Sequence, residues 1–155
     1  MCIFQLYFTI PSNLPISMKT LRINYMAVFM SAIATFVLGA IWYITFQPQW
    51  LALTGLTEDK IQAGGGGSIG YAVSFITYLL GAYAMALLFK SMNISTAQTG
   101  AMTGALVGAL IVGGNIFTNN AYEMKPVELS VLNAGFSAVS GAAMGAILGG
   151  WRKYT

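Results

Sequence analysis

The side chains best suited to bind a ligand form a polar group in the last third of the chain. The group comprises Asn115, Asn119, Asn120, Glu123, Lys125, Asn133 and Ser137. Each asparagine amide both donates and accepts hydrogen bonds, and the serine adds a hydroxyl. Polar groups inside apolar segments often mark binding sites or pathways. The acid and the lysine would then form the lip of such a site.

A packing role is the other interpretation of the same residues, and it is the one that we favour. Amides at membrane depth need partners, and hydrogen bonds between neighbouring helices satisfy them. Each such contact stabilises a helix pair by about 0.6 to 2 kcal/mol. Both interpretations stay open at this point, because residue types and spacing do not distinguish a packed cluster from a site.

Enzymatic chemistry lacks its usual residues in this sequence. The chain has no histidine, and its one thiol belongs to Cys2, close to the N-terminus. Glu123 and Glu128 lie five residues apart in a polar connection, which is more typical of solvated loop acids than of a catalytic pair. We therefore predict that the protein is not an enzyme, with no catalytic residues, no metal site and no cofactor.

The elements that carry these residues are long apolar runs. Of the 155 residues, 57% are hydrophobic and 7% are charged, whereas a soluble domain has about 25% charged residues. Four runs cover residues 25–46, 68–89, 97–118 and 129–151. Each is about as long as the roughly 20 residues that a helix needs to cross a bilayer. The sequence predicts an all-α fold, a four-helix transmembrane bundle formed by residues 23–155.

The first 22 residues read as a separate N-terminal arm. Residues 1–17 are apolar, but Pro11 and Pro15 break them into pieces too short to span. They also lack the basic start and small-residue cleavage site of a signal peptide. Because Met18 begins a typical cytoplasmic-end sequence, we favour Met18 as the true start. The alternative is a loose or interfacial arm.

Charged residues predict the orientation of the four spans. Five of the seven basic residues flank the spans on one side, and they are Lys19, Arg22, Lys90, Arg152 and Lys153. All four acids lie in the other two connections. The positive-inside rule then places both termini in the cytoplasm, in a multi-pass protein of the cytoplasmic (inner) membrane. The bases form no patch, so we predict no nucleic-acid partner.

Glycines at four-residue spacing predict how the third and fourth spans meet. The third span carries Gly100, Gly104 and Gly108, and the fourth carries Gly141, Gly145 and Gly149. Four-residue spacing keeps each set on one helix face, and such small residues let two helix backbones approach closely. Asn115 and Asn119 are expected to continue the first stripe, while Asn133 and Ser137 continue the second. We predict an antiparallel glycine-packed hairpin whose amides gather at the outer end.

Aromatic residues predict the membrane boundaries. Trp42, Tyr43 and Trp50 close the first span, and Trp151 closes the fourth. Tryptophan and tyrosine favour the headgroup level, so we interpret these four as interface anchors. Pro48 lacks an amide hydrogen and should end the first helix. Thr57 is a predicted N-cap of the short interfacial segment that follows.

The order of several short motifs resembles one family of membrane proteins. These motifs are Ile23-Asn-Tyr-Met-Ala-Val, Leu38-Gly-Ala-Ile-Trp-Tyr, Trp50, Gly55-Leu-Thr-Glu, the stretch 115–126 from Asn-Ile-Phe-Thr to Lys-Pro, Leu132-Asn-Ala-Gly and Met144-Gly-Ala-Ile-Leu-Gly-Gly-Trp. Together they resemble domain of unknown function 1761 over residues 23–151. The resemblance implies a small four-helix integral membrane protein and no established activity.

Two classes of function fit these observations. The first is a non-enzymatic accessory or interaction component of the membrane. The alternative is a transporter or channel for a small solute or lipid, which with only four helices would need to act as a homo-oligomer. The predicted partners are the lipid bilayer and either a second copy of the chain or another membrane protein.

Overall fold

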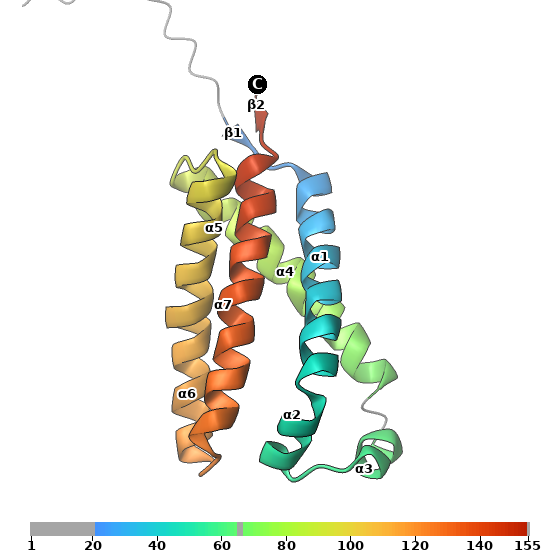
Figure 1. The fold of residues 1–155 in the computed structure, drawn as a ribbon. Coiled ribbons are helices and arrows are strands. Elements are labelled where there is room, and N and C mark those ends of the chain that lie inside the picture. The colour runs from blue at the N-terminus through green and yellow to red at the C-terminus, as the bar shows by residue number, and fades with distance from the viewer. Residues whose placement is uncertain (1–20, 65–66, 155) are drawn as a thin grey trace, which may run out of the picture.

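The computed structural model describes residues 21–64 and 67–154 (Figure 1). Its elements are β1 (Leu21–Arg22), α1 (Tyr25–Thr45), α2 (Gln47–Thr54), α3 (Glu58–Ala63), α4 (Ser68–Ser91), α5 (Ala97–Leu106), the π-helix η1 (Val107–Val112), α6 (Gly113–Tyr122), α7 (Val127–Gly150) and β2 (Lys153–Tyr154). The elements α5, η1 and α6 form one continuous span. Residues 1–20 of the predicted arm, with Cys2 and the alternative start Met18, lie outside the described residues.

Four helical segments are long and apolar enough to cross a membrane. They are Tyr25–Thr45, Ser68–Ser91, Ala97–Tyr122 and Val127–Gly150. These segments coincide with the four predicted runs to within a few residues at each end. The all-α fold with four candidate spans is therefore confirmed, and the chain is a multi-pass membrane protein.

Side-chain caps explain where several helices begin. Asn24 accepts a hydrogen bond from the Ala27 amide (3.4 Å) at the start of α1. Thr57 accepts one from the Lys60 amide (3.4 Å) at the start of α3, which confirms the predicted N-cap. Pro48 lies in the first turn of α2, where its missing amide hydrogen costs nothing. The first span accordingly ends at Thr45.

Helix α7 is the centre of the bundle. It packs against the α5–η1–α6 span on one side and against α1 on the other, while α4 crosses behind both α1 and α7 (Figure 1). The two ends of the described part of the chain, Leu21–Arg22 and Lys153–Tyr154, meet in the antiparallel pair β1–β2. We call this end, which also holds the α4–α5 turn, the terminal end. The opposite end, with α2, α3 and the α6–α7 turn, is the loop end.

The terminal end holds the tight core. Phe89 is fully buried among alanines, methionines and leucine from α1, α4 and α7. The guanidinium of Arg152 lies 5.5 Å from the centre of the Phe89 ring, a cation–π arrangement. Burial lowers the pKa of Arg152 from its usual value. Asn24 donates a hydrogen bond to the Trp151 carbonyl (3.1 Å) and so joins the start of α1 to the end of α7.

Glycines line the contact between α5 and α7. Gly100 faces Gly145, and Gly104 faces Gly141. A Cβ atom at any of these four positions would overlap a backbone carbonyl of the facing helix. The same holds at the two ends of the row, where Gly108 faces Ser137 and Gly149 faces Thr96. The two backbones are therefore in direct contact along this row, which we call the glycine seam.

Candidate functional site

A π turn interrupts the third span and changes which residues face α7. Residues Val107–Val112 form η1. Each π turn contains roughly one residue more than an α turn, because its hydrogen bonds run from i to i+5. The next position on the packed face after Gly108 is therefore Gly113 rather than residue 112. An added Cβ at Gly113 would lie 3.1 Å from the Cβ of Ala134 in α7.

This one-residue shift moves two of the predicted asparagines off the packed face. Asn115 and Asn119 are exposed, and Asn120 takes the place on the α7 side. The expectation that Asn115 and Asn119 continue the glycine stripe is therefore wrong. The amide of Asn119 instead donates to the Asn115 side-chain oxygen (2.9 Å) along the outer face of α6.

The other polar residues make separate contacts within the bundle. Asn120 donates through its side-chain amide to the hydroxyl of the buried Ser130 (2.9 Å), which links α6 to α7. Asn133 accepts a hydrogen bond from the Tyr43 hydroxyl (3.1 Å), which links α7 to α1. Ser137 donates to the backbone carbonyl of Asn133 (3.0 Å). The structure therefore divides the four asparagines among three places and does not bring them into one cluster.

Glu123 and Lys125 lie in the tight turn between α6 and α7. Both side chains are exposed. Met124 between them adopts a left-handed backbone conformation (φ 54°), and the Lys125 amide donates to the Asn120 carbonyl (2.9 Å). Both charges thus lie in the turn beside Asn120. Within residues 21–64 and 67–154, no three metal-ligating side chains come together.

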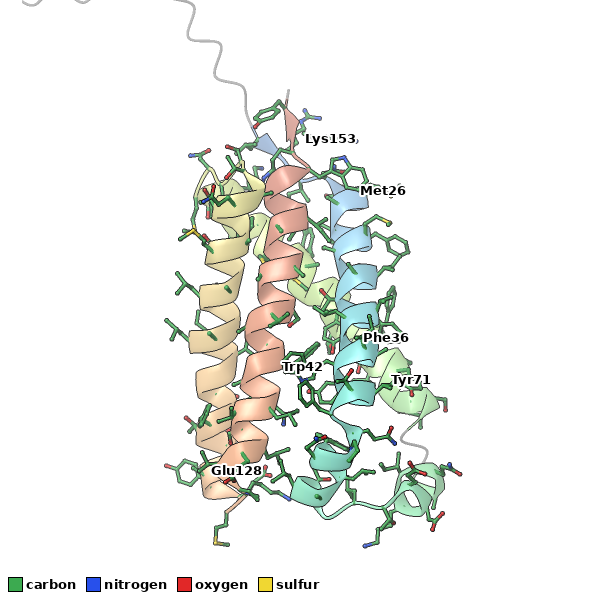
Figure 2. The ribbon with its side chains drawn as sticks, viewed as in Figure 1. Met26, Phe36, Trp42, Tyr71, Glu128 and Lys153 are labelled. Atoms are coloured by element: carbon green, nitrogen blue, oxygen red, sulfur yellow. The ribbon has the colours of Figure 1, made fainter. Side chains whose placement is uncertain are left out.

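The three tryptophans make different contacts in the bundle. Trp42 is directed between α1 and α7 (Figure 2). Its ring centre is 4.9 Å from that of Phe46 and 6.1 Å from that of Phe136. Trp50 in α2 packs edge-on against Tyr43, with ring centres 6.4 Å apart. Trp151 is 48% exposed at the terminal end.

A cavity of about 410 Å³ opens between α1, α2, α3 and α4 at the loop end. Its wall includes Phe36, Tyr43, Trp50, Tyr71, Ser74 and Tyr78. Phe36 and Tyr71 lie together on the α4 side of α1 (Figure 2), with ring centres 6.2 Å apart. The sequence reasoning missed this cavity. The available signal was the spacing of Tyr71, Ser74 and Tyr78, which are three and four residues apart and so lie on one face of α4.

The comparisons with known proteins identify the family alone. No curated protein and no solved structure matches the chain. Residues 26–149 match a family whose description is protein of unknown function (DUF1761). Because this match covers well over half of the sequence, the chain belongs to the DUF1761 family.

Proposed function

We propose that the protein is a non-enzymatic interaction component of the membrane, which binds another transmembrane helix through the outer face of α6. The observation that carries this proposal is the exposed pair of Asn115 and Asn119. Their amides are joined to each other at 2.9 Å and point away from α7.

The depth of this pair supports the proposal. The span Ala97–Tyr122 has 26 residues, and at 1.5 Å per residue Asn115 lies about 8 Å from its midpoint. The hydrocarbon core extends about 15 Å on each side of the bilayer centre. Asn115 therefore lies within the hydrocarbon when the span is centred, and Asn119 lies near its boundary.

The pair has hydrogen-bonding capacity to spare. Their mutual contact uses one N–H of Asn119 and the side-chain oxygen of Asn115. It leaves both N–H groups of Asn115 and the oxygen of Asn119 available. Such groups are costly to leave unpaired in hydrocarbon, so a partner helix that satisfies them would be favoured.

The neighbouring residues would let such a helix approach. Gly114 is exposed, and a Cβ added there would meet nothing within 4 Å. Thr118, one turn further along, is also exposed and donates its hydroxyl to the Gly114 carbonyl (3.0 Å). Small residues beside hydrogen-bonding side chains are the usual composition of helix–helix interfaces in membranes.

The simplest partner is a second copy of this chain. An amide offers a donor and an acceptor, so two copies related by a twofold axis complement each other across the same face. A complex with another membrane protein would use the same groups. The transporter or channel stays the alternative prediction, and the direct backbone contact along the glycine seam gives no support for a path between α5 and α7.

Cysteine cross-linking in native membranes tests this proposal. In a Cys2→Ser background, Asn115→Cys should form a disulfide-linked dimer, whereas Leu80→Cys on the exposed face of α4 should not. Asn115→Leu combined with Asn119→Leu should shift the purified protein from dimer to monomer. A protein that is monomeric before and after these changes, with no cross-link at position 115, would contradict the proposal.

A further inference from the structure

We propose that the cavity between α1, α2, α3 and α4 binds a neutral lipid with a hydroxyl-bearing headgroup, such as a monoacylglycerol. This inference goes beyond the proposed function, because the cavity lies on different helices from Asn115 and Asn119. It rests on the position of the cavity, on its size and on the chemistry of its wall.

The cavity exists because α4 leans away from α7 toward the loop end (Figure 1). Helices α2 and α3 turn beneath it and close its lower side. Gly70 in the first turns of α4 belongs to the wall, and a Cβ added there would meet nothing within 4 Å. The space is therefore not filled by a side chain from α4 at this position.

The size of the cavity suits a small amphiphile. Its volume of about 410 Å³ falls within the range of about 300–1,000 Å³ that is typical of ligand pockets. Ile44 and Tyr71 belong to the wall and are 71% and 65% exposed, so they form a rim on the outer surface of the bundle. A hydrocarbon tail can leave the cavity past this rim and enter the surrounding lipid.

The wall combines aromatic surface with uncharged hydrogen-bonding groups. Tyr71 and Tyr78 supply phenolic hydroxyls, Ser74 an alcohol, and Gln47 an amide. Tyr43 contributes its ring, because its hydroxyl donates to Asn133 in α7. Phe36, Ile44 and Leu51 are among the apolar residues of the wall. This arrangement can hold a polar headgroup by hydrogen bonds while it covers the first part of the tail.

The absence of charge in this wall selects among lipids. Among the described residues that line the cavity, none is an acid, a lysine or an arginine. The neighbouring charge is the Glu58 carboxylate, which accepts a hydrogen bond from the Gln47 amide (2.9 Å) and supplies no cation. A phosphate or carboxylate placed there would lose its hydration without gaining a cationic partner, which is strongly unfavourable. A glycerol headgroup loses less, because hydroxyl and amide partners replace its hydrogen bonds to water.

Tryptophan fluorescence provides the test, because Trp50 belongs to the wall. The full chain with Trp42→Phe and Trp151→Phe retains Trp50 as its only tryptophan, since the sequence has three. In phosphatidylcholine nanodiscs, this protein is titrated with a dibrominated monoacylglycerol, whose bromines quench nearby indole rings. The dibrominated fatty acid of the same chain length provides the charged comparison. We expect saturable quenching by the monoacylglycerol, at least tenfold tighter than by the fatty acid.

Variants of the wall locate the binding. Gly70→Phe fills the cavity and should abolish saturable quenching. Gly81→Phe is the matched control, because Gly81 lies on the same helix, outside the cavity wall, and also has open space around it. It should leave the affinity within twofold. Tyr78→Phe removes one hydroxyl at nearly constant shape and should weaken binding by about two- to tenfold.

Three results would overturn the proposal. Quenching that rises without saturation, or that is the same in Gly70→Phe, would show partitioning into the bilayer and not binding in the cavity. Equal affinity for the fatty acid would refute the neutral headgroup. Should Gly70→Phe fail to fold by size-exclusion chromatography, Tyr78→Phe decides, and an unchanged affinity there counts against the site. Dimer cross-linking through Asn115 is measured separately, so failure here leaves that proposal standing.

Discussion

Substituting Gly104 by alanine tests the glycine seam most directly. The added Cβ would overlap the carbonyl oxygen of Gly141, and it would lie 2.8 Å from the carbonyl carbon of the same residue and 3.2 Å from the Cα of Gly145. All three atoms belong to the backbone of α7. No side-chain rotation can relieve this overlap, so α5 and α7 must move apart.

The expected magnitude follows from two opposing effects. Overpacking a well-packed interface costs about 1–3 kcal/mol, whereas replacing glycine by alanine inside a helix gains about 1 kcal/mol. Comparison with Gly81→Ala isolates the cost of overpacking, because Gly81 is in the interior of α4 and a Cβ there meets nothing within 4 Å. Both variants gain the same helix propensity. We therefore expect Gly104→Ala to be about 1–3 kcal/mol less stable than Gly81→Ala.

Equilibrium unfolding in mixed micelles measures this difference. The purified protein in dodecyl maltoside is titrated with sodium dodecyl sulfate, and the loss of helical circular dichroism gives the free energy of unfolding. Gly81→Ala should match or slightly exceed the parent protein, while Gly104→Ala should unfold at a lower fraction of dodecyl sulfate. Equal stability of the two variants would refute the close backbone contact between α5 and α7.

Two further predictions concern the terminal end and the orientation. Asn24→Ala removes both the cap of α1 and the hydrogen bond to the Trp151 carbonyl, and Asn24 is only 6% exposed. In the same assay, the free energy of unfolding should fall by about 1–3 kcal/mol, which is clearly more than for Thr57→Ala at the exposed cap of α3. An equal fall in the two variants would contradict the role of Asn24 in both hydrogen bonds. The orientation is tested in a Cys2→Ser background with a membrane-impermeant maleimide. Lys60→Cys should react on intact cells, whereas Lys90→Cys should react only after lysis. The reverse pattern would overturn the topology with both termini in the cytoplasm.

The four spans could be predicted from sequence because lipid leaves few alternatives. A long apolar segment in a bilayer must satisfy its backbone hydrogen bonds internally, and a helix does so. Uncharged runs of sufficient length therefore locate Tyr25–Thr45 and the other three segments almost directly. The Thr57 cap was predictable for a similar reason, since its hydrogen bond with the Lys60 amide is local in sequence.

The π turn could not be read from residue types. Hydropathy is the same whether the backbone of Val107–Val112 winds as an α- or a π-helix. Adjacent glycines at 113 and 114 add to the ambiguity, because either fits a close contact. Yet the extra residue in this turn decides that Asn120 faces α7 and that Asn115 faces outward.

The cavity could not be predicted because it depends on the angle between distant helices. The spacing of Tyr71, Ser74 and Tyr78 defines one face of α4, but spacing does not show what that face meets. The partner of Asn133 was equally hidden, because Tyr43 precedes it by 90 residues. Such contacts arise from the crossing of whole helices, and no local pattern in the sequence encodes that crossing.

Residue size explains why both proposed sites lie toward the loop end. Association of helices in lipid has no hydrophobic driving force, so close packing depends on small residues that let backbones meet. The glycine seam and the buried alanines Ala27, Ala82 and Ala86 provide such packing toward the terminal end. Toward the loop end the bulky ring of Phe136 stands between the spans, with its centre 5.3 Å from that of Tyr43 and 6.3 Å from that of Tyr78.

Large rings and the π turn thus have related effects on opposite sides of α7. On the α1–α4 side, rings replace backbone contact, and a cavity with tyrosine hydroxyls in its wall adjoins them. On the α6 side, the π turn directs Asn115 and Asn119 outward. A bundle that is closed by small residues at one end can present polar groups at the other without losing its fold. Binding is therefore expected to depend on loop-end residues, and stability on those of the seam and the terminal core.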